Sequence, residues 1–570
     1  MPNSAPPAPP GSFFRKPTFW LLVLLALAIA ARAWLLFRTA LVPGMNGAYY
    51  LVQARALLEH GRLGIPDLPL TFWLQAGLAR LCQLVTGLPP EDAILLTVKL
   101  ADSVLPPLVA IPLARLALQW TAAGERASTL ALLAPAAAAA LGAQALRMAG
   151  DFQKNSLALV WFAALAPAAL VFLRRPSRQT MLAPLVLLAL LGLTHIGVLG
   201  GALVFCGLLA LAALATAERT ARRHILLLLG LGASVLGLAG GTAYALYDPA
   251  RVTRLVTAFT QPASFGTERP PGAPDPPLDF AADDDTDLLA SFDVDDAFTE
   301  VREHSPRPPA GFGGPAGGPP AGPSFHPGAP GPQGRLPEVL CVGVSVAALW
   351  ILWRQRRHVG SADFSVVFAA AVTGLVLAAP LFDAQKAERL RLIATVPVAI
   401  AGSFVITRVV VPVWSRALGA GVFLFVLTDA ARTLSGGAGV LITRPVFDEL
   451  VALRAQCPQP QHTLVVARHG LEWWAAWTLR TNIAQPQAVT ATDWARYSQV
   501  LYLSEKAPLG PPRGFPGLGA PHGVHAEPGM SGETEWFAHA EVLHEGAALK
   551  LVRLSRAPVE WLRVDPMPAK

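Results

Sequence analysis

Long apolar runs recur along most of the chain, at lengths close to the roughly 20 residues that a helix needs to cross a bilayer. Most of them are bounded by Arg, Pro or Gly, and there are about eleven. They cover residues 19–37, 93–118, 128–146, 156–173, 181–193, 196–215, 225–246, 337–353, 364–381, 392–406 and 409–429. This pattern predicts a polytopic α-helical membrane protein.

Two of these assignments depend on a turn inside a longer apolar run. Residues 181–215 form one run that is too long for a single crossing and just long enough for two short ones. We place the turn near His195. The run over 392–429 also needs a turn, which the residues around Arg408 can supply.

The stretch of residues 44–81, just after the first span, has a different pattern. A Tyr-Tyr pair and helix-spaced apolar residues are mixed with charged ones, and a PDLP segment at 66–69 then precedes a second, apolar helix. We therefore predict an ordered structure at the membrane face, within a structured loop over residues 41–90.

The end of the chain changes to short apolar runs that are typical of strands. The predicted strands are 463–467, 500–503 and 548–554, and the predicted helices are 445–457 and the Trp-rich 471–479. A turn at Arg468-His469-Gly470 separates the first strand from its helix. Residues 431–570 are therefore expected to form a small α/β domain.

Two Pro-rich segments lack apolar periodicity. Residues 1–18 are expected to be a disordered tail, and residues 261–336 a disordered loop in which an acidic segment, 283–296, interrupts Pro and Gly. Such a composition buries too little apolar surface to fold, so a solvated acidic segment is favoured over a cation site. The transmembrane domain is thus predicted over residues 19–430.

Composition and charge agree with this class. The 570-residue chain is 53% hydrophobic and 15% charged, with a mean hydropathy of +0.45, which excludes a soluble globular protein. Its four scattered cysteines show neither a disulfide framework nor a metal-binding spacing.

The basic residues predict the orientation in the cell membrane, because cationic loops resist translocation. If the N terminus is cytoplasmic, the basic clusters at 15–16, 174–178, 219–223 and 354–357 all fall on the cytoplasmic side. The loop after the first span and the C-terminal domain are then extracytoplasmic. The formal charge of +7 follows from this topology, so nucleic acid is not an expected partner.

The arrangement of these parts resembles the GT-C superfamily of integral membrane glycosyltransferases, which use polyprenyl-phosphate-linked sugars. The resemblance covers nearly the whole chain and is carried by GMNGAYYLVQARALLEHG with PDLPLTFWLQAGLARL, GDFQKNSLALVW, LTHIG and FDAQKAERLRLIATVPVAIAG. It implies a divergent GT-C-like fold with about eleven membrane helices, a site at the extracytoplasmic face, and a polyprenyl-phosphate-linked sugar and membrane lipid as partners.

The resemblance also implies an acid early in the first outer loop, where this chain has Asn46. A carboxylate acts as a base or holds a divalent cation, whereas an Asn amide only forms hydrogen bonds. Asp67 in the same loop and Asp151 at the outer end of the fourth span are the acids that we expect to serve instead, and a divalent cation is a candidate cofactor. Each acid has a structural alternative, because each precedes a predicted helix that it can cap.

Cationic and aromatic side chains at headgroup depth are candidates for binding the carrier. Arg grips phosphate oxygens through two hydrogen bonds, Lys acts as a point charge, and Tyr stacks on sugars. The alternative is that these side chains collect at the interface for their amphipathic character alone. The candidates are Lys154, Lys386, Arg389 and Arg391 for the phosphate, His195 as a proton carrier or phosphate ligand, and Tyr49 and Tyr50 for the sugar or the lipid groove.

Lys99 and Asp102 lie inside a predicted span, where ionisable groups are costly and therefore suggest function. Their spacing of three places them on one helix face. An internal ion pair and a role at the site are both compatible with this pattern.

Three classes of function fit the sequence. The first is a glycosyltransferase that moves a sugar from a polyprenyl-phosphate carrier to a lipid, glycan or protein acceptor at the extracytoplasmic face. The second is a lipid or sugar transporter or flippase, which predicts internal repeats and charges at the bilayer midplane. The third is a non-catalytic scaffold, for which Asn46 is the main argument. No convincing repeat is visible and the polar candidates gather outside the membrane, so the sequence favours the first class.

Overall fold

The computed structural model describes residues 17–121, 129–216, 219–246, 332–379, 384–408, 412–437, 439–486, 489, 491–506 and 540–555. The expected tail over 1–18 and the expected loop over 261–336 fall almost entirely outside these residues, although one helix already begins at Pro332.

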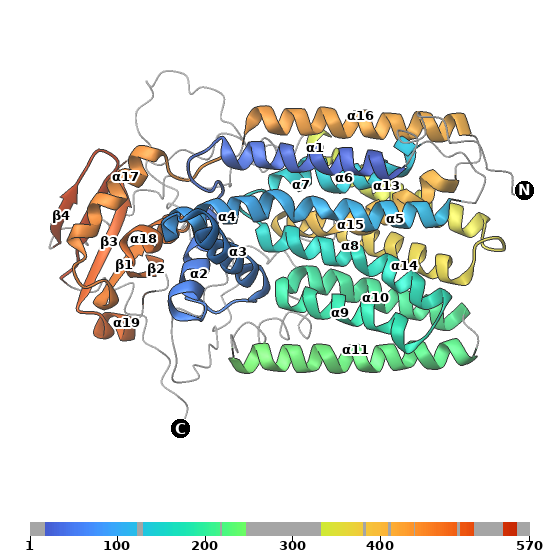
Figure 1. Ribbon diagram of the computed structural model, residues 1–570, viewed down its shortest axis with the longest axis horizontal. Helices are drawn as coiled ribbons and strands as arrows, with labels where there is room; N and C mark the ends of the chain where they lie inside the picture. Colours follow the sequence, from blue (N-terminus) through green and yellow to red (C-terminus); the bar gives the residue numbers. More distant parts are fainter. Residues whose placement is uncertain are drawn as a thin grey trace, which may run out of the picture.

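Most of the described chain forms long helices that lie side by side in one bundle (Figure 1). Apolar runs become helices in a bilayer because every backbone N–H and C=O must be satisfied within the protein. In chain order they are α1 (Pro17–Phe37), α4 (Pro90–Val104), the 3-10 turn η2 (Pro106–Val109), α5 (Ala110–Trp120), α6 (Thr129–Leu141), α7 (Ala143–Arg147), α8 (Gln153–Arg174), α9 (Arg178–Thr194), α10 (Ile196–Thr216), α11 (Arg219–Leu246), α13 (Pro332–Arg354), α14 (Ser361–Ala378), α15 (Ala384–Arg408) and α16 (Pro412–Gly436).

The helices are those of a multi-pass membrane protein, as predicted. Within the described residues, 7 helices are long and apolar enough to cross a membrane, and shorter apolar helices lie beside them. The turn near His195 is confirmed, since α9 ends at Thr194 and α10 begins at Ile196. The run over 93–118 is not one straight helix, because Pro106 and Pro107 open η2 between α4 and α5. The count of about eleven crossings stays a prediction.

Two shorter helices, α2 (Gly47–His60) and α3 (Leu70–Thr86), form from the stretch 44–81 and lie at one end of the bundle (Figure 1). Left-handed glycines end both helices, Gly61 at φ +69° and Gly87 at φ +70°. The first part of α2 is buried on all sides, because α3 and α4 cover one flank and the C-terminal part of the chain covers another. The stretch thus forms two helices, and most of the first is buried.

The described residues between 439 and 555 form a small α/β domain, here called the sheet domain, at the same end (Figure 1). Its strand order is β2-β1-β3-β5-β4. The strands are β1 (Thr463–Ala467), β2 (Asn482–Ala484) and β3 (Gln499–Glu505), which are parallel, and β4 (Glu541–Glu545) and β5 (Leu549–Arg553), which are antiparallel; the helices are α17 (Arg444–Ala452), α18 (Leu471–Leu479) and α19 (Ala491–Arg496). Strands β2 and β4 were not predicted.

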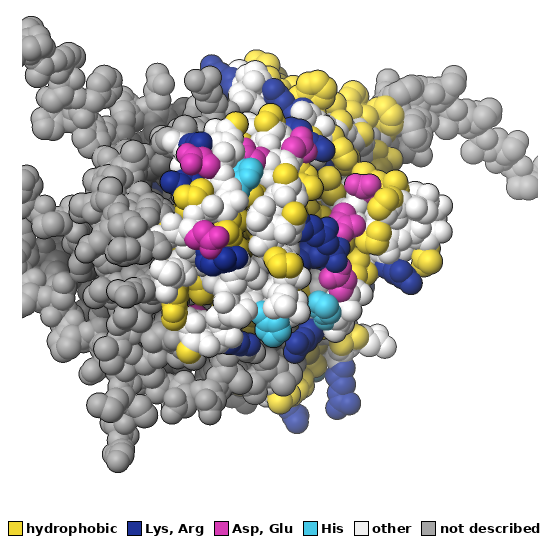
Figure 2. Space-filling view, turned by 90° about the vertical axis from the view of Figure 1, so that its left-hand side faces the viewer, with side chains coloured by type: hydrophobic (Ala, Val, Ile, Leu, Met, Phe, Trp, Pro, Cys, Tyr) yellow, Lys and Arg dark blue, Asp and Glu magenta, His cyan; other side chains and the backbone are white. Residues whose placement is uncertain are grey.

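The sheet domain is docked on α2 by polar and aromatic contacts. The Arg55 guanidinium donates to the backbone carbonyls of Trp477 at 2.6 Å and Ala476 at 2.7 Å, which lie in the last turn of α18. The Gly44 N–H donates to the Gly439 carbonyl at 2.9 Å. Seen from the sheet-domain end, Lys, Arg, Asp and Glu side chains are interspersed over the surface (Figure 2).

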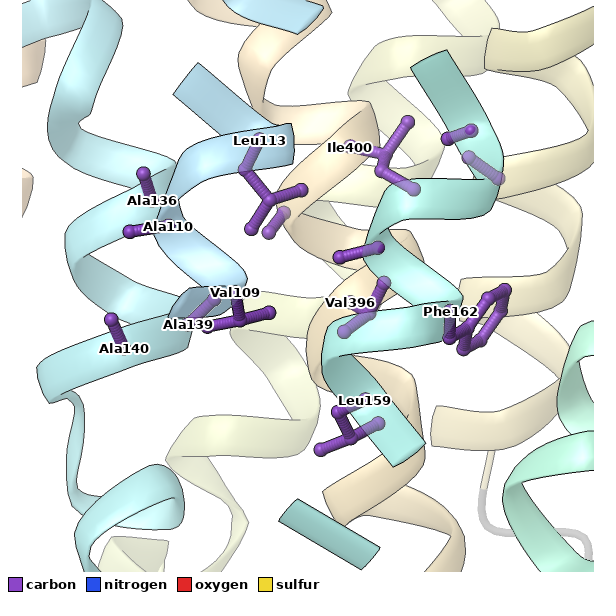
Figure 3. Close-up of a cluster of buried hydrophobic side chains, with 14 of the residues drawn as sticks. Val109, Ala110, Leu113, Ala136, Ala139, Ala140, Leu159, Phe162, Val396 and Ile400 are labelled. Atoms are coloured by element: carbon purple, nitrogen blue, oxygen red, sulfur yellow. The ribbon is translucent and has the colours of Figure 1, made fainter. Parts of the chain in front are cut away.

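Small side chains pack the centre of the bundle. Ala136, Ala139 and Ala140 of α6 lie against Val109 and Ala110 where η2 joins α5 (Figure 3), and all five are buried. Small residues let helix backbones approach closely, and membrane helices rely on such packing because lipid is as apolar as their own side chains. The close packing of these helices thus supports the polar residues at the end of the bundle.

Candidate functional site

Asp67 lies between α2 and α3 and is the centre of a buried polar cluster. Its Oδ2 accepts hydrogen bonds from the Tyr49 hydroxyl and the Lys154 Nζ, and its Oδ1 accepts one from the Leu68 N–H at 2.7 Å. The Lys154 Nζ also lies 5.7 Å from the centroid of the Phe72 ring. The Asp67 side chain is 1% exposed and the Lys154 side chain 16%. Lys154 is therefore the charged member of this pair that a ligand can reach.

Asp151 lies in the turn before α8, pressed against the start of α2. The Asn46 N–H donates to Asp151 Oδ1 at 2.8 Å. Gly44 has φ +92°, and a Cβ there would lie 2.6 Å from the Asp151 Cβ; Gly150 has φ +85°, and a Cβ there would overlap the Pro43 carbonyl. Only glycine fits these two positions. The two segments are thus held in contact, and Asn46 and Asp151 with them.

Tyr50 lies between the Asp67 cluster and the segment that carries Asp151. Its hydroxyl donates to the Asp151 carbonyl at 3.1 Å and accepts from the Gln153 N–H at 3.0 Å. Burial raises the pKa of Tyr50 well above its usual value, so the hydroxyl stays protonated. The Tyr49 and Tyr50 rings pack edge to face with centroids 5.6 Å apart. The structure therefore brings six of the predicted site residues into one network: Asn46, Tyr49, Tyr50, Asp67, Asp151 and Lys154.

Neither acid caps a helix, so the capping interpretation was wrong for both. The N-cap positions are Pro69 for α3 and Phe152 for α8, and neither end has a side-chain capping bond. Helix α3 begins later than the apolar pattern suggested, which leaves Asp67 outside its first turn. The two carboxylates instead bind Lys154 and the Asn46 N–H.

The other predicted phosphate ligands lie on α9, α10 and α15. His195 Nδ1 accepts from the Val198 N–H at 3.2 Å, so this ring caps the start of α10. Arg389 and Arg391 lie in the first turns of α15 and are partly buried. Lys386 lies in the same helix, and its side chain is outside the described residues. Their role in binding a carrier stays a prediction.

Asp102 pairs with Arg32 of α1 and not with Lys99. The Arg32 Nη2 lies 2.6 Å from Asp102 Oδ1, with both side chains almost fully buried, and the Gly150 N–H donates to Asp102 Oδ2 at 2.7 Å. Lys99 Nζ donates to two backbone carbonyls after α1 at 2.7 and 3.0 Å. The internal pair suggested by the spacing was therefore wrong. The buried Arg32–Asp102 pair instead holds the turn that carries Asp151, through the Gly150 N–H.

A second polar group, which the sequence showed only as part of a turn, lies against this network. His469 Nδ1 lies 2.9 Å from Glu472 Oε1, and Gln485 Nε2 donates to the same oxygen at 3.0 Å. A Cβ on Gly470 would lie 3.0 Å from Met45 Cγ, so this turn touches the start of α2. The only signal in the sequence is a His and a Glu three residues apart at the start of a predicted helix.

Among the described residues, no group of three or more His, Cys, Asp or Glu side chains is arranged to hold a metal ion.

The fold is similar to solved structures of two proteins. The oligosaccharyltransferase of Archaeoglobus fulgidus, solved with Zn and sulfate, has a TM-score of 0.51 and 12% identity over 84% of this chain and 67% of that chain. ArnT from Cupriavidus metallidurans has TM-scores of 0.49 in the apo state and 0.48 bound to undecaprenyl phosphate, each with 12% identity over 94% of this chain and 98% of that chain. No protein-family model matches the chain, and no curated protein matches its sequence. At this identity the likeness to the oligosaccharyltransferase establishes the fold alone, and it agrees with the predicted fold class.

Proposed function

We propose that this chain is a membrane glycosyltransferase that moves a sugar from a polyprenyl-phosphate carrier to a lipid, glycan or protein acceptor at the extracytoplasmic face, with its N terminus in the cytoplasm. The observation that carries the proposal is the network of Asp67, Lys154 and Asp151 between the bundle and the sheet domain. A fold shared with an oligosaccharyltransferase supports it. A lipid phosphate at the membrane surface would lie at the depth of this network.

Lys154 is the residue that we assign to the carrier phosphate. Its ammonium group is partly exposed and oriented by Asp67, and Tyr49 donates to the same carboxylate oxygen. A fixed cation stabilises the charge that develops on the leaving phosphate. Arg389 and Arg391 at the start of α15 are proposed as further phosphate contacts.

Asp151 is the residue that we assign to the acceptor. Asp67 is almost fully buried and paired with Lys154, whereas Asp151 is partly exposed, and its Oδ1 accepts from the Asn46 N–H. The backbone N–H of residue 46 thus positions the acid, and this contact does not depend on the Asn46 side chain. Its own Oδ1 is buried without a hydrogen-bond partner among the described residues, so the side chain is available to a donor on a ligand.

In the reaction, the acceptor oxygen forms a bond to the anomeric carbon, and the bond from that carbon to the phosphate oxygen breaks. The electron pair of the broken bond leaves with the lipid phosphate, which faces Lys154. The acceptor proton passes to the Asp151 carboxylate. Positioned proton transfer of this kind contributes about 10²–10⁴-fold to a rate.

The test is transfer from a labelled polyprenyl-phosphate sugar by the full-length protein in liposomes. Asp151→Asn and Lys154→Met should each lower kcat by about 100-fold or more. Asp363→Asn is the matched control, because Asp363 is also a partly buried, ion-paired acid but binds Arg174 at the far end of α8. The proposal is refuted if the wild type transfers no sugar from any such donor, or if both site variants retain wild-type rates. Movement of the intact carrier across the bilayer without transfer would instead support a flippase.

A further inference from the structure

His469 stands at a position where open parallel sheets usually bind ligands. Strand β1 lies between β2 and β3, and the chain passes from β1 to β2 on one side and then crosses to β3 on the other. Loops that diverge from neighbouring strands in this way leave a crevice at the carboxyl ends of the strands. His469 follows the end of β1, where the strand order switches from one side of β1 to the other. Next to it, Arg468 pairs with Glu505 at the end of β3 at 2.7 Å.

A buried carboxylate holds the His469 ring in place. The Glu472 side chain is 2% exposed and the His469 side chain 15%, with Nδ1 of the ring on the Glu472 carboxylate. A carboxylate that accepts from Nδ1–H sets the orientation of an imidazole and favours its protonated form. Gln485 donates to the same oxygen and keeps Glu472 in position. The ring is thus held in one orientation.

The turn that carries His469 packs on the segment that holds Asp151. Gly470 has φ +89°, and its hydrogen takes the place where a side chain would meet Met45 of the segment before α2. The next residue, Asn46, binds the Asp151 carboxylate through its N–H. The turn that carries His469 and the Asp151 carboxylate therefore contact adjacent residues, Met45 and Asn46.

The charges around His469 agree with this placement. Burial lowers the pKa of His469, but the Glu472 carboxylate and, more weakly, Asp151 outweigh burial and raise it above its usual value; Arg468 opposes them. Asp151 is therefore within electrostatic reach of the ring. The charged groups that act on the ring come from α18, from its own turn and from the membrane domain.

We infer that His469, fixed by Glu472, is a positioning residue of the proposed site, whose imidazolium keeps the Asp151 carboxylate ionised and oriented toward the acceptor. The inference rests on the role proposed for Asp151. It makes the sheet domain part of the reaction machinery, because the cation comes from one domain and the acid from the other. When His469 is removed, Asp151 binds a proton more readily, so the acid limb of the pH–rate profile moves to higher pH.

The contact is tested first without any assay of transfer. The ring protons of His469 are followed by NMR across a pH titration of the full-length protein, and their signal is assigned by its loss in His469→Gln. Asp151→Asn should shift the titration of His469 to lower pH, and Glu472→Gln should shift it further. His462, an exposed ring at the other end of β1, is the internal control and should not move. An unchanged His469 titration in Asp151→Asn overturns the inference, whether or not the protein transfers sugar.

The role is tested next by kinetics. His469→Gln should lower kcat by about 10-fold or more, with KM for the carrier little changed and the acid limb displaced to higher pH. His462→Gln is the matched control and should behave as the wild type. A His469→Gln variant with wild-type kcat and pH profile overturns the inference. If the wild type shows no transfer while Asp151→Asn still shifts the His469 titration, the proposed function fails and the contact between the two domains stands.

Discussion

Removing the cation from the Asp67–Lys154 pair tests how the site is held together. In a Lys154→Met variant, Asp67 keeps the hydrogen bonds from the Tyr49 hydroxyl and the Leu68 N–H, but it loses the positive charge beside a side chain that is only 1% exposed. Breaking one side of a buried ion pair costs about 3–5 kcal/mol. Because the Lys154 position is 16% exposed, water relieves part of this cost. We therefore expect a loss of about 3 kcal/mol.

The measurement is the rate of thermal unfolding in one fixed detergent, because large membrane proteins often unfold irreversibly and a rate is then the meaningful quantity. If the pair is fully formed in the native state and broken in the transition state, about 3 kcal/mol corresponds to unfolding about 100-fold faster. The double variant Asp67→Asn, Lys154→Met removes both charges and should recover most of the loss.

An exposed pair supplies the control for this experiment. Arg444 and Asp448 lie on the surface of α17, with side chains 63% and 56% exposed, so Arg444→Met should change stability by no more than about 1 kcal/mol. Wild-type unfolding rates in Lys154→Met, or a double variant that unfolds faster than the single one, would refute the reasoning.

Two further predictions concern Gly44, in the segment before α2, and His469, in the sheet domain. Gly44→Ala puts a Cβ 2.6 Å from the Asp151 Cβ at a φ of +92°, so this variant should lose at least about 1–2 kcal/mol of stability together with transfer activity. Gly77→Ala, whose Cβ meets no atom within 4 Å, is the control and should be as stable as the wild type. Thermal unfolding of both variants decides this. Burial lowers the pKa of His469, but Glu472 and Asp151 outweigh burial and raise this pKa in the folded protein. Protonated His469 therefore stabilises the fold fully below its unfolded pKa of about 6.5. This contribution is lost as pH rises through the raised pKa of the folded state. The difference in thermal midpoint between wild type and His469→Gln should therefore shrink as pH rises, and a difference that grew with pH would contradict the sign.

Hydrophobic patterns were sufficient to predict most of the helices and the buried strands β1, β3 and β5, although helix α19 was not predicted. Strand β1 and helix α18 lie within the predicted ranges, because both are mostly apolar and are bounded by clear turns. Strand β2 was missed because it has three residues, and β4 because it is a largely exposed edge strand that begins and ends with Glu. An edge strand needs no apolar alternation, so the sequence carries little sign of it.

The sequence predicted only those site residues that stand out as polar residues in an apolar chain. Asp67, Asp151 and Lys154 were identified in this way, and the structure joins them in one network. Their partners were not predictable, because pairing depends on contacts between distant segments. Asp102 has Lys99 one turn away along its own helix, yet it binds Arg32 of α1. His469 looked like a turn residue, since nothing in its local sequence shows that Met45 lies beside the turn that carries it.

The contact between the first and last helices of the membrane bundle, α1 and α16, has a consequence for how the protein is made. The Arg38 guanidinium, just after α1, donates to the Leu434 carbonyl of α16 at 3.0 Å, and the Gly44 N–H donates to the Gly439 carbonyl at 2.9 Å. A chain is synthesised from its N terminus, so α1 and the loop that carries Asn46 emerge long before their partners. The nascent protein therefore holds an incomplete loop at the membrane surface until α16 and the sheet domain arrive. The proposed site can therefore be completed only after the sheet domain has been synthesised, and we expect a chain truncated before Gly439 to lack transfer activity.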